Sequence, residues 1–185
     1  MAFNLVDNNI SGVCEIKISP FEDHRGSFLN IFKAENQEFQ KNWGSREIKQ
    51  INLSHTKNIG TIRGMHMQKD PFAEAKLITC IKGKIWDVVV DLRKKSPTFG
   101  NWCKIVLSSE LNNSLFIPEG FAHGFQALEN NVEMIYVHSQ NWSKDHETGI
   151  YYKDLSLNIT WPLKETNLSQ RDLNLPSFNS YEKLL

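Results

Sequence analysis

The sequence of 185 residues contains few cysteines, no excess of either charge and no long apolar run. Its three cysteines, Cys14, Cys80 and Cys103, are an odd number without motif spacing, and the first residues lack the basic start and apolar stretch of a secretory signal. Both features favour reduced thiols and a cytoplasmic protein over a disulfide-stabilised secreted one. A formal net charge of zero, from 21 Lys and Arg against 21 Asp and Glu, argues against a protein that binds nucleic acid by neutralising phosphates. No apolar run approaches the roughly 20 residues that span a bilayer, so we expect no membrane segment.

The composition that remains is that of a globular protein. Apolar residues make up 40% of the chain and charged residues 23%, and eleven Phe and five Trp supply large core side chains. A chain of this length buries about two-thirds of its unfolded surface, so it needs no disulfide or metal to fold. Because we find no repeat, low-complexity tract or flexible linker, we expect residues 1–185 to form a single domain.

Short apolar runs separated by turn residues predict a mainly β protein. The expected strands are Cys14–Ile18, Gly26–Phe32, Ile48–His55, Gly60–Gln68, Lys76–Lys82, Lys84–Leu92, Trp102–Leu107, Ser114–Ile117, His123–Ala127 and Val132–Ser139. The Lys82–Lys84 break predicts a hairpin turn between two of them, and Ala34–Asn42 predicts one short helix around Phe39. After about residue 142 the pattern weakens, so we expect a helical or irregular C-terminal segment that packs on the β core. Two apolar faces built from short strands favour a β-sandwich or jelly roll.

Two of these runs contain polar residues that a simple strand does not need. In Phe21–Phe28 a turn leads Arg25 into a strand, and on its own this segment indicates an ordinary surface turn. In Ile62–Gln68, alternation puts His66 and Gln68 on one face of the strand. A lone strand histidine is more often structural than functional, so neither segment decides anything alone.

Two later stretches add further polar residues. The Pro-x-Gly-x-x-His spacing of Pro118–His123 places a rigid turn before a strand, and it resembles the second motif of the cupin β-barrels, in which that histidine points into the barrel. In Met134–His138, Tyr136 shares a face with the histidine. A buried tyrosine needs a hydrogen-bond partner, so Tyr136 is either a structural anchor or a proton donor.

Together, His66, His123, Lys76 and Tyr136 would suit proton transfer to and from a carbon acid if they share one barrel mouth. The competing hypothesis is a metal site, since cupins often bind a divalent ion through three histidines and a glutamate. That site needs a His-x-His motif followed by an acid, whereas this chain has Gln68 two residues after His66. Two histidines and a distant acid fall short of a usual catalytic metal shell, so we expect no metal.

Longer motifs in a fixed order resemble the dTDP-4-dehydrorhamnose 3,5-epimerase family over about residues 14 to 176. They are Arg63–Gln68, Ala75–Leu77, Trp86–Arg93, Ser96–Gly100, Ile117–Phe125, Glu147–Ile150, Ile159–Pro162 and Leu168–Asp172. The resemblance implies a metal-free, cofactor-independent cupin-like jelly roll that is usually a homodimer. It also implies epimerisation at C-3 and C-5 of a 4-keto-6-deoxy-hexose held as a nucleotide diphosphate sugar, in deoxysugar biosynthesis of the rhamnose type.

The resemblance also assigns roles by position. His66 matches the catalytic base and Asp172 the acid that orients it, while Lys76 matches the residue that stabilises the enolate. Tyr136 matches the proton donor on the opposite face of the sugar. The positions that match substrate and diphosphate contacts are Arg25, Gln50, Asn52, Arg63, His123, Glu147 and Arg171.

The chain departs from the family pattern at a few positions. Asn30 stands where family members commonly carry an acid, and Asn141 and Trp142 replace a pair of tyrosines, of which Trp142 can still stack on a base or close the site. The sequence therefore leaves open whether one or both carbons are inverted. Two other classes also stay open, namely a metal-dependent cupin oxygenase or isomerase and a non-catalytic cupin that binds nucleotide sugars. Simple alternation puts Arg63 and His66 on opposite faces, so both line one site only if the glycine between them allows a bulge or bend.

Overall fold

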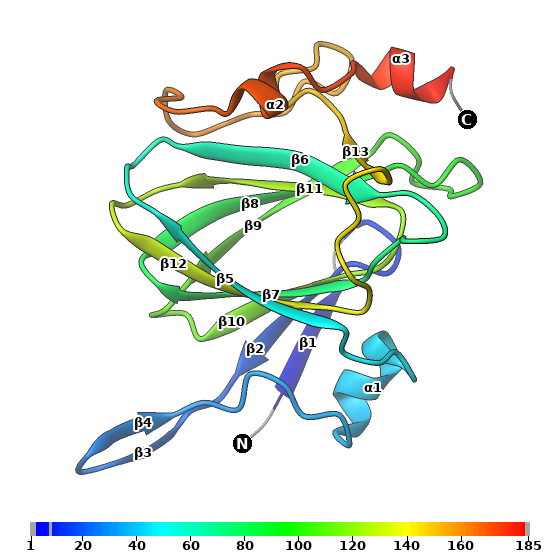
Figure 1. The fold of residues 1–185 in the computed structure, drawn as a ribbon. Coiled ribbons are helices and arrows are strands. Elements are labelled where there is room, and N and C mark those ends of the chain that lie inside the picture. The colour runs from blue at the N-terminus through cyan, green and yellow to red at the C-terminus, as the bar shows by residue number, and fades with distance from the viewer. Residues whose placement is uncertain (1–2, 8, 184–185) are drawn as a thin grey trace.

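The computed structural model describes residues 3–7 and 9–183, and its strands form two antiparallel sheets and a small hairpin (Figure 1). The six-stranded sheet has the order β1 (Phe3–Asp7), β2 (Cys14–Ile18), β10 (Asn113–Ile117), β7 (Lys76–Lys82), β12 (Val132–His138) and β5 (Gln50–Thr56). The five-stranded sheet has the order β13 (Glu147–Gly149), β6 (Ile62–Gln68), β11 (Phe121–Ala127), β8 (Lys84–Asp91) and β9 (Trp102–Ser108). The hairpin consists of β3 (Phe21–Asp23) and β4 (Gly26–Phe28) and projects from the body of the molecule. The predicted mainly β, jelly-roll architecture is confirmed.

The two sheets pack against each other through apolar side chains. Ile78 of β7 and Leu115 of β10 meet Val89 of β8 and Phe125 of β11 in this core, and all four are at most 1% exposed. The other face of β8, including Val88, packs under the C-terminal segment. That segment carries α2 (Gln170–Leu173) and α3 (Phe178–Glu182) and crosses the outer face of the five-stranded sheet (Figure 1). Burial on both faces explains why β8 is an almost continuous apolar run.

The remaining helix, α1 (Gln37–Trp43), covers the outer face of the six-stranded sheet. Asn36 caps the helix, since its side chain accepts a hydrogen bond from the backbone N–H of Phe39 at 3.0 Å. Phe39 and Trp43 are almost fully buried, and the Trp43 ring meets Phe116 of β10 edge-on at 6.1 Å. The predicted short helix around Phe39 is thus confirmed, with its start shifted to the residue after the cap. Within the described residues, none of the helices has the length and apolar character needed to cross a bilayer.

Some local predictions are wrong. The predicted strand Gly26–Phe32 ends at Phe28, because the apolar residues after Phe28 pack against the buried side chains of α1. The ring centroids of Phe32 and Phe39, for example, are 4.7 Å apart. The Lys82–Lys84 break joins β7 to β8, which lie in different sheets, so it is a crossing between the layers rather than a hairpin turn. Strands β1, β3 and β13 lie outside every predicted run.

An irregularity in β6 lets Arg63 and His66 face the same side of the sheet. His66 pairs with His123 of β11, and Arg63 pairs with Phe125, so three steps along β6 match two steps along β11. One extra residue in a strand reverses the alternation beyond it. Gly64 lies in this stretch with φ +129°, and a Cβ atom there would come within 2.5 Å of the β11 backbone. The bulge that the sequence requires is therefore present, at a position where only glycine fits.

Candidate active site

A cavity of about 770 Å³ lies between the two sheets. The six-stranded sheet contributes side chains from β5, β7 and β12, and the five-stranded sheet contributes side chains from β6, β11 and β13. Residues of α2, of the segment just before α2 and of the segment before β13 complete the wall. The cavity brings together all the predicted site residues except Arg25, namely Gln50, Asn52, Arg63, His66, Lys76, His123, Tyr136, Trp142, Glu147, Arg171 and Asp172.

His66 and Asp172 form a hydrogen-bonded pair on one side of this cavity. His66 Nε2 lies 2.7 Å from Asp172 Oδ1, and the backbone N–H of Gly64 donates to Asp172 Oδ2 at 3.2 Å. Ser169 caps α2 and so fixes Asp172 in the first turn of this short helix. Burial alone raises the pKa of the Asp172 carboxyl, but the bonds and charge from His66 outweigh it and lower the pKa to about 2. The ionised carboxylate accepts the Nε2 proton and leaves Nδ1 of His66 as the basic nitrogen.

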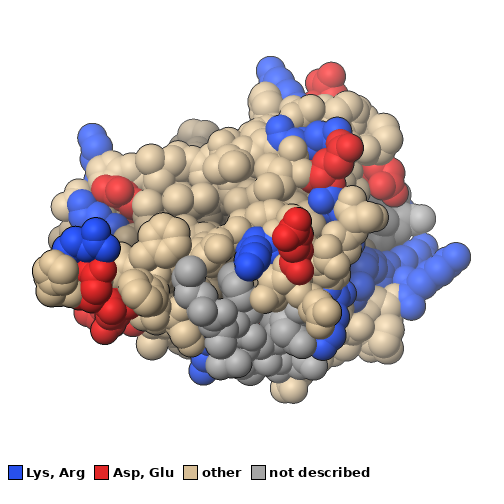
Figure 2. Space-filling model, turned by 90° about the horizontal axis from the view of Figure 1, so that it is seen from below, with Lys and Arg blue, Asp and Glu red and all other residues tan. Residues whose placement is uncertain are grey.

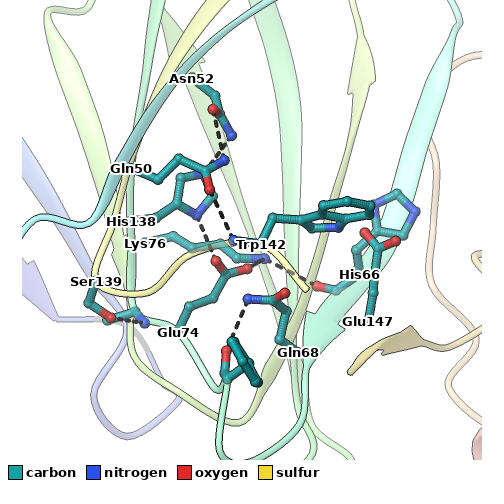
Figure 3. A network of polar contacts seen from close by, with 12 residues as sticks. Gln50, Asn52, His66, Gln68, Glu74, Lys76, His138, Ser139, Trp142 and Glu147 are labelled. Carbon is teal, nitrogen blue, oxygen red and sulfur yellow. Dashed lines mark hydrogen bonds and ion pairs between the residues drawn. The ribbon is translucent and has the colours of Figure 1, made fainter. Parts of the chain in front are cut away.

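Lys76 belongs to a second buried group that includes two unpredicted residues (Figure 3). Its Nζ lies 3.1 Å from Glu74 Oε1, while Glu74 Oε2 lies 2.9 Å from Nδ1 of His138. Lys76 Nζ also donates to the backbone carbonyl of His66 at 3.4 Å. Burial raises the pKa of Glu74, but Lys76 and His138 together lower it below its ordinary value. The ionised Glu74 carboxylate therefore holds the Lys76 ammonium in place beside the His66–Asp172 pair.

Tyr136 lies on β12, on the sheet opposite His66. Its ring stacks on His138 with centroids 5.9 Å apart, and it meets His123 edge-on at 6.3 Å. A tyrosine hydroxyl is protonated near neutral pH, and burial raises the pKa of the Tyr136 phenol further above its ordinary value. A protonated hydroxyl and a basic imidazole thus line opposite walls of one cavity.

His123 is oriented by a buried carboxylate that sequence reasoning also missed. Asp87 of β8 is fully buried, and its Oδ2 lies 2.8 Å from His123 Nε2. Burial raises the pKa of Asp87, and His123 opposes that rise. Among the described residues, Asp87 Oδ1 has no hydrogen-bond partner. The pair fixes the imidazole of His123 beside Tyr136.

Two arginines give the cavity a cationic rim. Arg171 donates to Glu147 Oε2 at 2.8 Å and lies 3.0 Å from His66 Nε2. Because a guanidinium only donates and Nε2 already gives its proton to the ionised carboxylate, the Arg171 contact does not set the tautomer. Arg63 is held by hydrogen bonds to β5 at 3.1 Å. Both guanidinium groups suit the recognition of an anion such as a diphosphate.

Arg25 lies apart from the cavity, on the projecting hairpin. Its side chain is 78% exposed and pairs with Asp23 at 2.6 Å. In the view from below, Lys or Arg side chains lie directly beside Asp or Glu side chains at the end where the hairpin projects (Figure 2). Phe21 and Phe28 of the same hairpin are 60% and 62% exposed. The structure of one chain therefore does not bring Arg25 to the site that its own His66 lines.

The part of the chain that the structure describes holds no group of three or more His, Cys, Asp or Glu side chains that could bind a metal ion. His66 is paired with Asp172, and His123 is paired with Asp87. Gln68 donates to two backbone carbonyls at 3.0 and 3.1 Å, so its amide ties loops together. His66, Gln68 and His123, which occupy the positions of a cupin metal site, are thus each hydrogen-bonded to protein groups.

The family model for dTDP-4-dehydrorhamnose 3,5-epimerase matches residues 7–180. The chain belongs to the dTDP-4-dehydrorhamnose 3,5-epimerase family. It is 39% identical over 176 residues to the dTDP-4-dehydrorhamnose 3,5-epimerase of Shigella flexneri, covering 95% of this chain and 96% of that protein. Among solved structures, it is similar to NovW, a 4-keto-6-deoxy sugar epimerase from Streptomyces spheroides, with TM-score 0.92, 32% identity and coverage of 100% and 92%. It is also similar to ChmJ, a 3'-monoepimerase from Streptomyces bikiniensis in complex with dTDP-quinovose, with TM-score 0.89, 31% identity and coverage of 96% and 89%.

Three polar side chains that contact the predicted residues of this epimerase-family site were not themselves predicted: Glu74 and His138, which line the cavity, and Asp87, which lies behind His123. Each is the direct partner of a predicted residue or stacks on one. Strand alternation held a usable signal, since Glu74 lies two residues before Lys76 and His138 lies two residues after Tyr136. Alternation does not predict which strands pair, and it is this pairing that brings Glu74 into contact with both Lys76 and His138.

Proposed function

We propose that this protein inverts C-3, C-5 or both in a nucleotide-linked 4-keto-6-deoxy-hexose, most simply dTDP-4-keto-6-deoxyglucose, in deoxysugar biosynthesis of the rhamnose type. The observation that carries the proposal is the placement of the His66–Asp172 pair on one wall of the cavity and Tyr136 on the other. Inversion at carbon needs a base on one face and an acid on the opposite face, and this cavity offers both. Membership of the epimerase family supports the same chemistry.

The first step removes the hydrogen from the carbon next to the ketone. Nδ1 of His66 takes the proton, the C–H electron pair becomes a carbon–carbon double bond, and the ketone oxygen becomes an enolate oxygen. The Asp172 carboxylate stabilises the imidazolium that forms. The Lys76 ammonium, fixed by Glu74 inside the cavity, stabilises the negative oxygen, an interaction that is usually a large part of the catalytic effect.

The second step returns a proton to the other face of the same carbon. The Tyr136 hydroxyl supplies this proton, the double-bond electrons form the new C–H bond, and the ketone is restored. Tyr136 starts the cycle protonated, as a tyrosine phenol is near neutral pH, and burial raises its pKa further. Proton exchange with solvent then returns His66 and Tyr136 to their starting states, so atoms and charges balance without a cofactor.

The remaining predicted residues would bind the substrate around this centre. Arg63 and Arg171 would hold the diphosphate at the rim, where bidentate guanidinium contacts are favourable. Gln50, Asn52 and His123 line the wall and would bind the sugar or phosphate oxygens, while Trp142 at the opening would stack on the base or sugar. Glu147 would orient Arg171, to which it is hydrogen-bonded.

Solvent deuterium uptake tests this function. When dTDP-4-keto-6-deoxyglucose is incubated with the protein in D₂O, it should acquire deuterium at C-3 and C-5. NMR measures this uptake. Uptake with inversion at one carbon only would assign a mono-epimerase, which is the activity named for ChmJ. Absence of uptake across a panel of nucleotide-linked 4-keto sugars would overturn the proposal and leave a binding module.

We also propose that the protein works as a homodimer in which the β3–β4 hairpin of one copy reaches the cavity of the other. Arg25 matches a substrate contact by position, yet its exposed side chain lies outside its own chain's cavity. The exposed Phe21 and Phe28 beside it would be covered by a second copy. Edge strand β5 also exposes Ile51 and Leu53, which offers further apolar surface for a partner.

Subunit mixing tests this arrangement. Arg25→Ala is expected to lower kcat/KM about 10- to 100-fold through loss of a charge-assisted contact, and His66→Ala to inactivate its own cavity. Random mixing of the impaired Arg25→Ala variant with the inactive His66→Ala variant should restore about a quarter of wild-type activity, because half of the dimers would contain one intact site. If mixing restores nothing although mixed dimers form, Arg25 does not act in the partner's site.

We propose, finally, that residues 1–185 act as one domain in the cytoplasm. Both sheets build the cavity, so neither could carry the site alone. A nucleotide diphosphate sugar is too highly charged to cross a hydrocarbon layer readily, so enzyme and substrate should share a compartment. A single unfolding transition and recovery in the cytoplasmic fraction are expected, and two transitions or export would contradict this.

A further inference from the structure

A continuous chain of hydrogen bonds runs along the cavity wall from Glu74 to the backbone of Trp142 (Figure 3). Glu74 Oε2 lies 2.9 Å from Nδ1 of His138, and Nε2 of His138 lies 3.3 Å from Asn52 Nδ2. Gln50 Nε2 then donates to Asn52 Oδ1 at 2.9 Å, and the backbone N–H of Trp142 donates to Gln50 Oε1 at 2.9 Å. Every link joins two side chains or a side chain and a backbone group of the site.

The two ends of this chain allow only one direction for its bonds. The Glu74 carboxylate, ion-paired with Lys76, can only accept, and the backbone N–H of Trp142 can only donate. His138 must therefore carry its proton on Nδ1 and accept at Nε2, which makes Asn52 the donor there. All the links then agree, from Trp142 through the two amides and the imidazole to Glu74.

We propose that Glu74 and His138 are positioning residues that set the hydrogen-bond direction of Asn52 and Gln50 and thereby present N–H donors to the acceptor-rich oxygens of a nucleotide diphosphate sugar. In the direction described, each amide uses one N–H in the chain and keeps a second N–H unused by it. Both amides line the cavity. The class of ligand rests on the proposed function. The direction of the hydrogen bonds rests on the Glu74 carboxylate and the Trp142 N–H at the two ends of the series.

The same chain also holds the segment that carries Trp142 at the cavity opening. The Trp142 side chain is 54% exposed, and its backbone is tied to β5 through Gln50. If His138 gains a second proton, Nε2 becomes a donor and can no longer accept from Asn52. Reversing Asn52 and Gln50 to accommodate it would set a Gln50 N–H against the Trp142 N–H, so one link must break.

Charged and polar groups from three strands and the segment before β7 face His138. Glu74 is hydrogen-bonded to its ring, and Lys76 pairs with His138 in the register between β7 and β12. Tyr136 stacks on the ring in its neutral form, and the β5 neighbours Gln50 and Asn52 are uncharged amides. Because a second proton on His138 breaks its hydrogen bond with Asn52, acidification is expected to weaken ligand binding.

Two substitutions of His138 separate this role from a merely structural one. His138→Ala interrupts the chain. In His138→Gln, the amide nitrogen can donate to Glu74 and the amide oxygen can accept from Asn52, so the direction is kept without a titrating group. His55→Gln, an exposed histidine of the same strand pair outside the cavity lining, is the matched control.

The test measures calorimetric binding of dTDP to the full chain at about pH 8 and about pH 5.5, on either side of a typical histidine pKa. At the higher pH, His138→Ala should bind about tenfold more weakly, which corresponds to about 1.4 kcal/mol, while His138→Gln stays within about threefold of wild type. On acidification, wild type and His55→Gln should lose more affinity than His138→Gln. The Trp142 amide should exchange its hydrogen at least about tenfold faster in His138→Ala than in wild type.

Equal pH dependence in wild type and His138→Gln would overturn the inference, and this comparison stands even if His138→Ala fails to fold. Unchanged dTDP binding by folded His138→Ala would also overturn it, without touching the proposed function. If wild type binds no dTDP at all, the proposed substrate class and this inference fall together. If dTDP binding responds as described but no deuterium exchange occurs, only the proposed catalysis fails.

Discussion

His66→Ala is expected to lower kcat/KM by about 10³-fold or more and to abolish deuterium uptake at C-3 and C-5. General base catalysis contributes about 10²- to 10⁴-fold, and here the base also starts the reaction. The variant removes the imidazole but leaves the cationic rim, so dTDP binding should change little. Deuterium uptake by NMR and dTDP binding by calorimetry measure the two effects separately.

The partner of His66 provides an internal control for this result. Asp172→Asn keeps a side chain of similar size in the first turn of α2 but removes the carboxylate that fixes the tautomer, so a smaller loss is expected. Because the pair acts as a unit, the double variant should be no slower than His66→Ala alone. His55→Ala, on an exposed histidine outside the cavity lining, should retain wild-type turnover. Full activity in folded His66→Ala would refute the assigned role.

Tyr136→Phe is expected to lower the formation of inverted product by about 10²-fold or more while leaving deuterium uptake within about tenfold of wild type. The substitution removes the proton donor on one face, but His66 can still take a proton and return one to the same face. A tyrosine phenol is protonated near neutral pH, and burial raises the pKa of Tyr136 further, so the hydroxyl holds its proton until the enolate forms. Comparing deuterium uptake with product stereochemistry in the same sample measures the two rates.

Tyr181→Phe is a matched control for this experiment. Both tyrosine hydroxyls lie 3.6 Å from a methionine sulfur, and burial raises the pKa of both phenols. Tyr181 packs in the cluster beneath the C-terminal segment rather than in the cavity. Normal inversion in Tyr181→Phe together with lost inversion in Tyr136→Phe is the expected pattern. Equal loss of exchange and inversion in Tyr136→Phe would give Tyr136 a different role.

Local pattern was sufficient for much of the fold. Strands β2 and β7 have the predicted bounds, because the apolar residues of β2 alternate with polar ones and β7 is a short apolar run bounded by Lys76 and Lys82. The conflict between Arg63 and His66 could be recognised from alternation alone, and it pointed to the bulge at Gly64 that the register shows. At these positions the alternation of side chains along a strand is enough to predict the local structure.

Contacts between distant segments could not be predicted in the same way. Glu74 and His138 are 64 positions apart, and they meet only because β7 and β12 pair with Lys76 opposite His138. Similarly, the Lys82–Lys84 break looks like a hairpin locally, but the partners of β7 and β8 place the two strands in different sheets. Strand order and register are properties of the whole chain, so a local sequence pattern does not contain them.

The central claim is that His66 removes a proton next to the ketone and that Tyr136 returns one to the opposite face. The most direct measurement is position-resolved deuterium NMR of the sugar after limited turnover of dTDP-4-keto-6-deoxyglucose in D₂O by wild type, His66→Ala and Tyr136→Phe. We predict one deuterium at each inverted carbon with wild type, none with His66→Ala, and deuterium without inversion with Tyr136→Phe. Inverted product without deuterium from wild type, or uptake by His66→Ala at the wild-type rate, would contradict the claim.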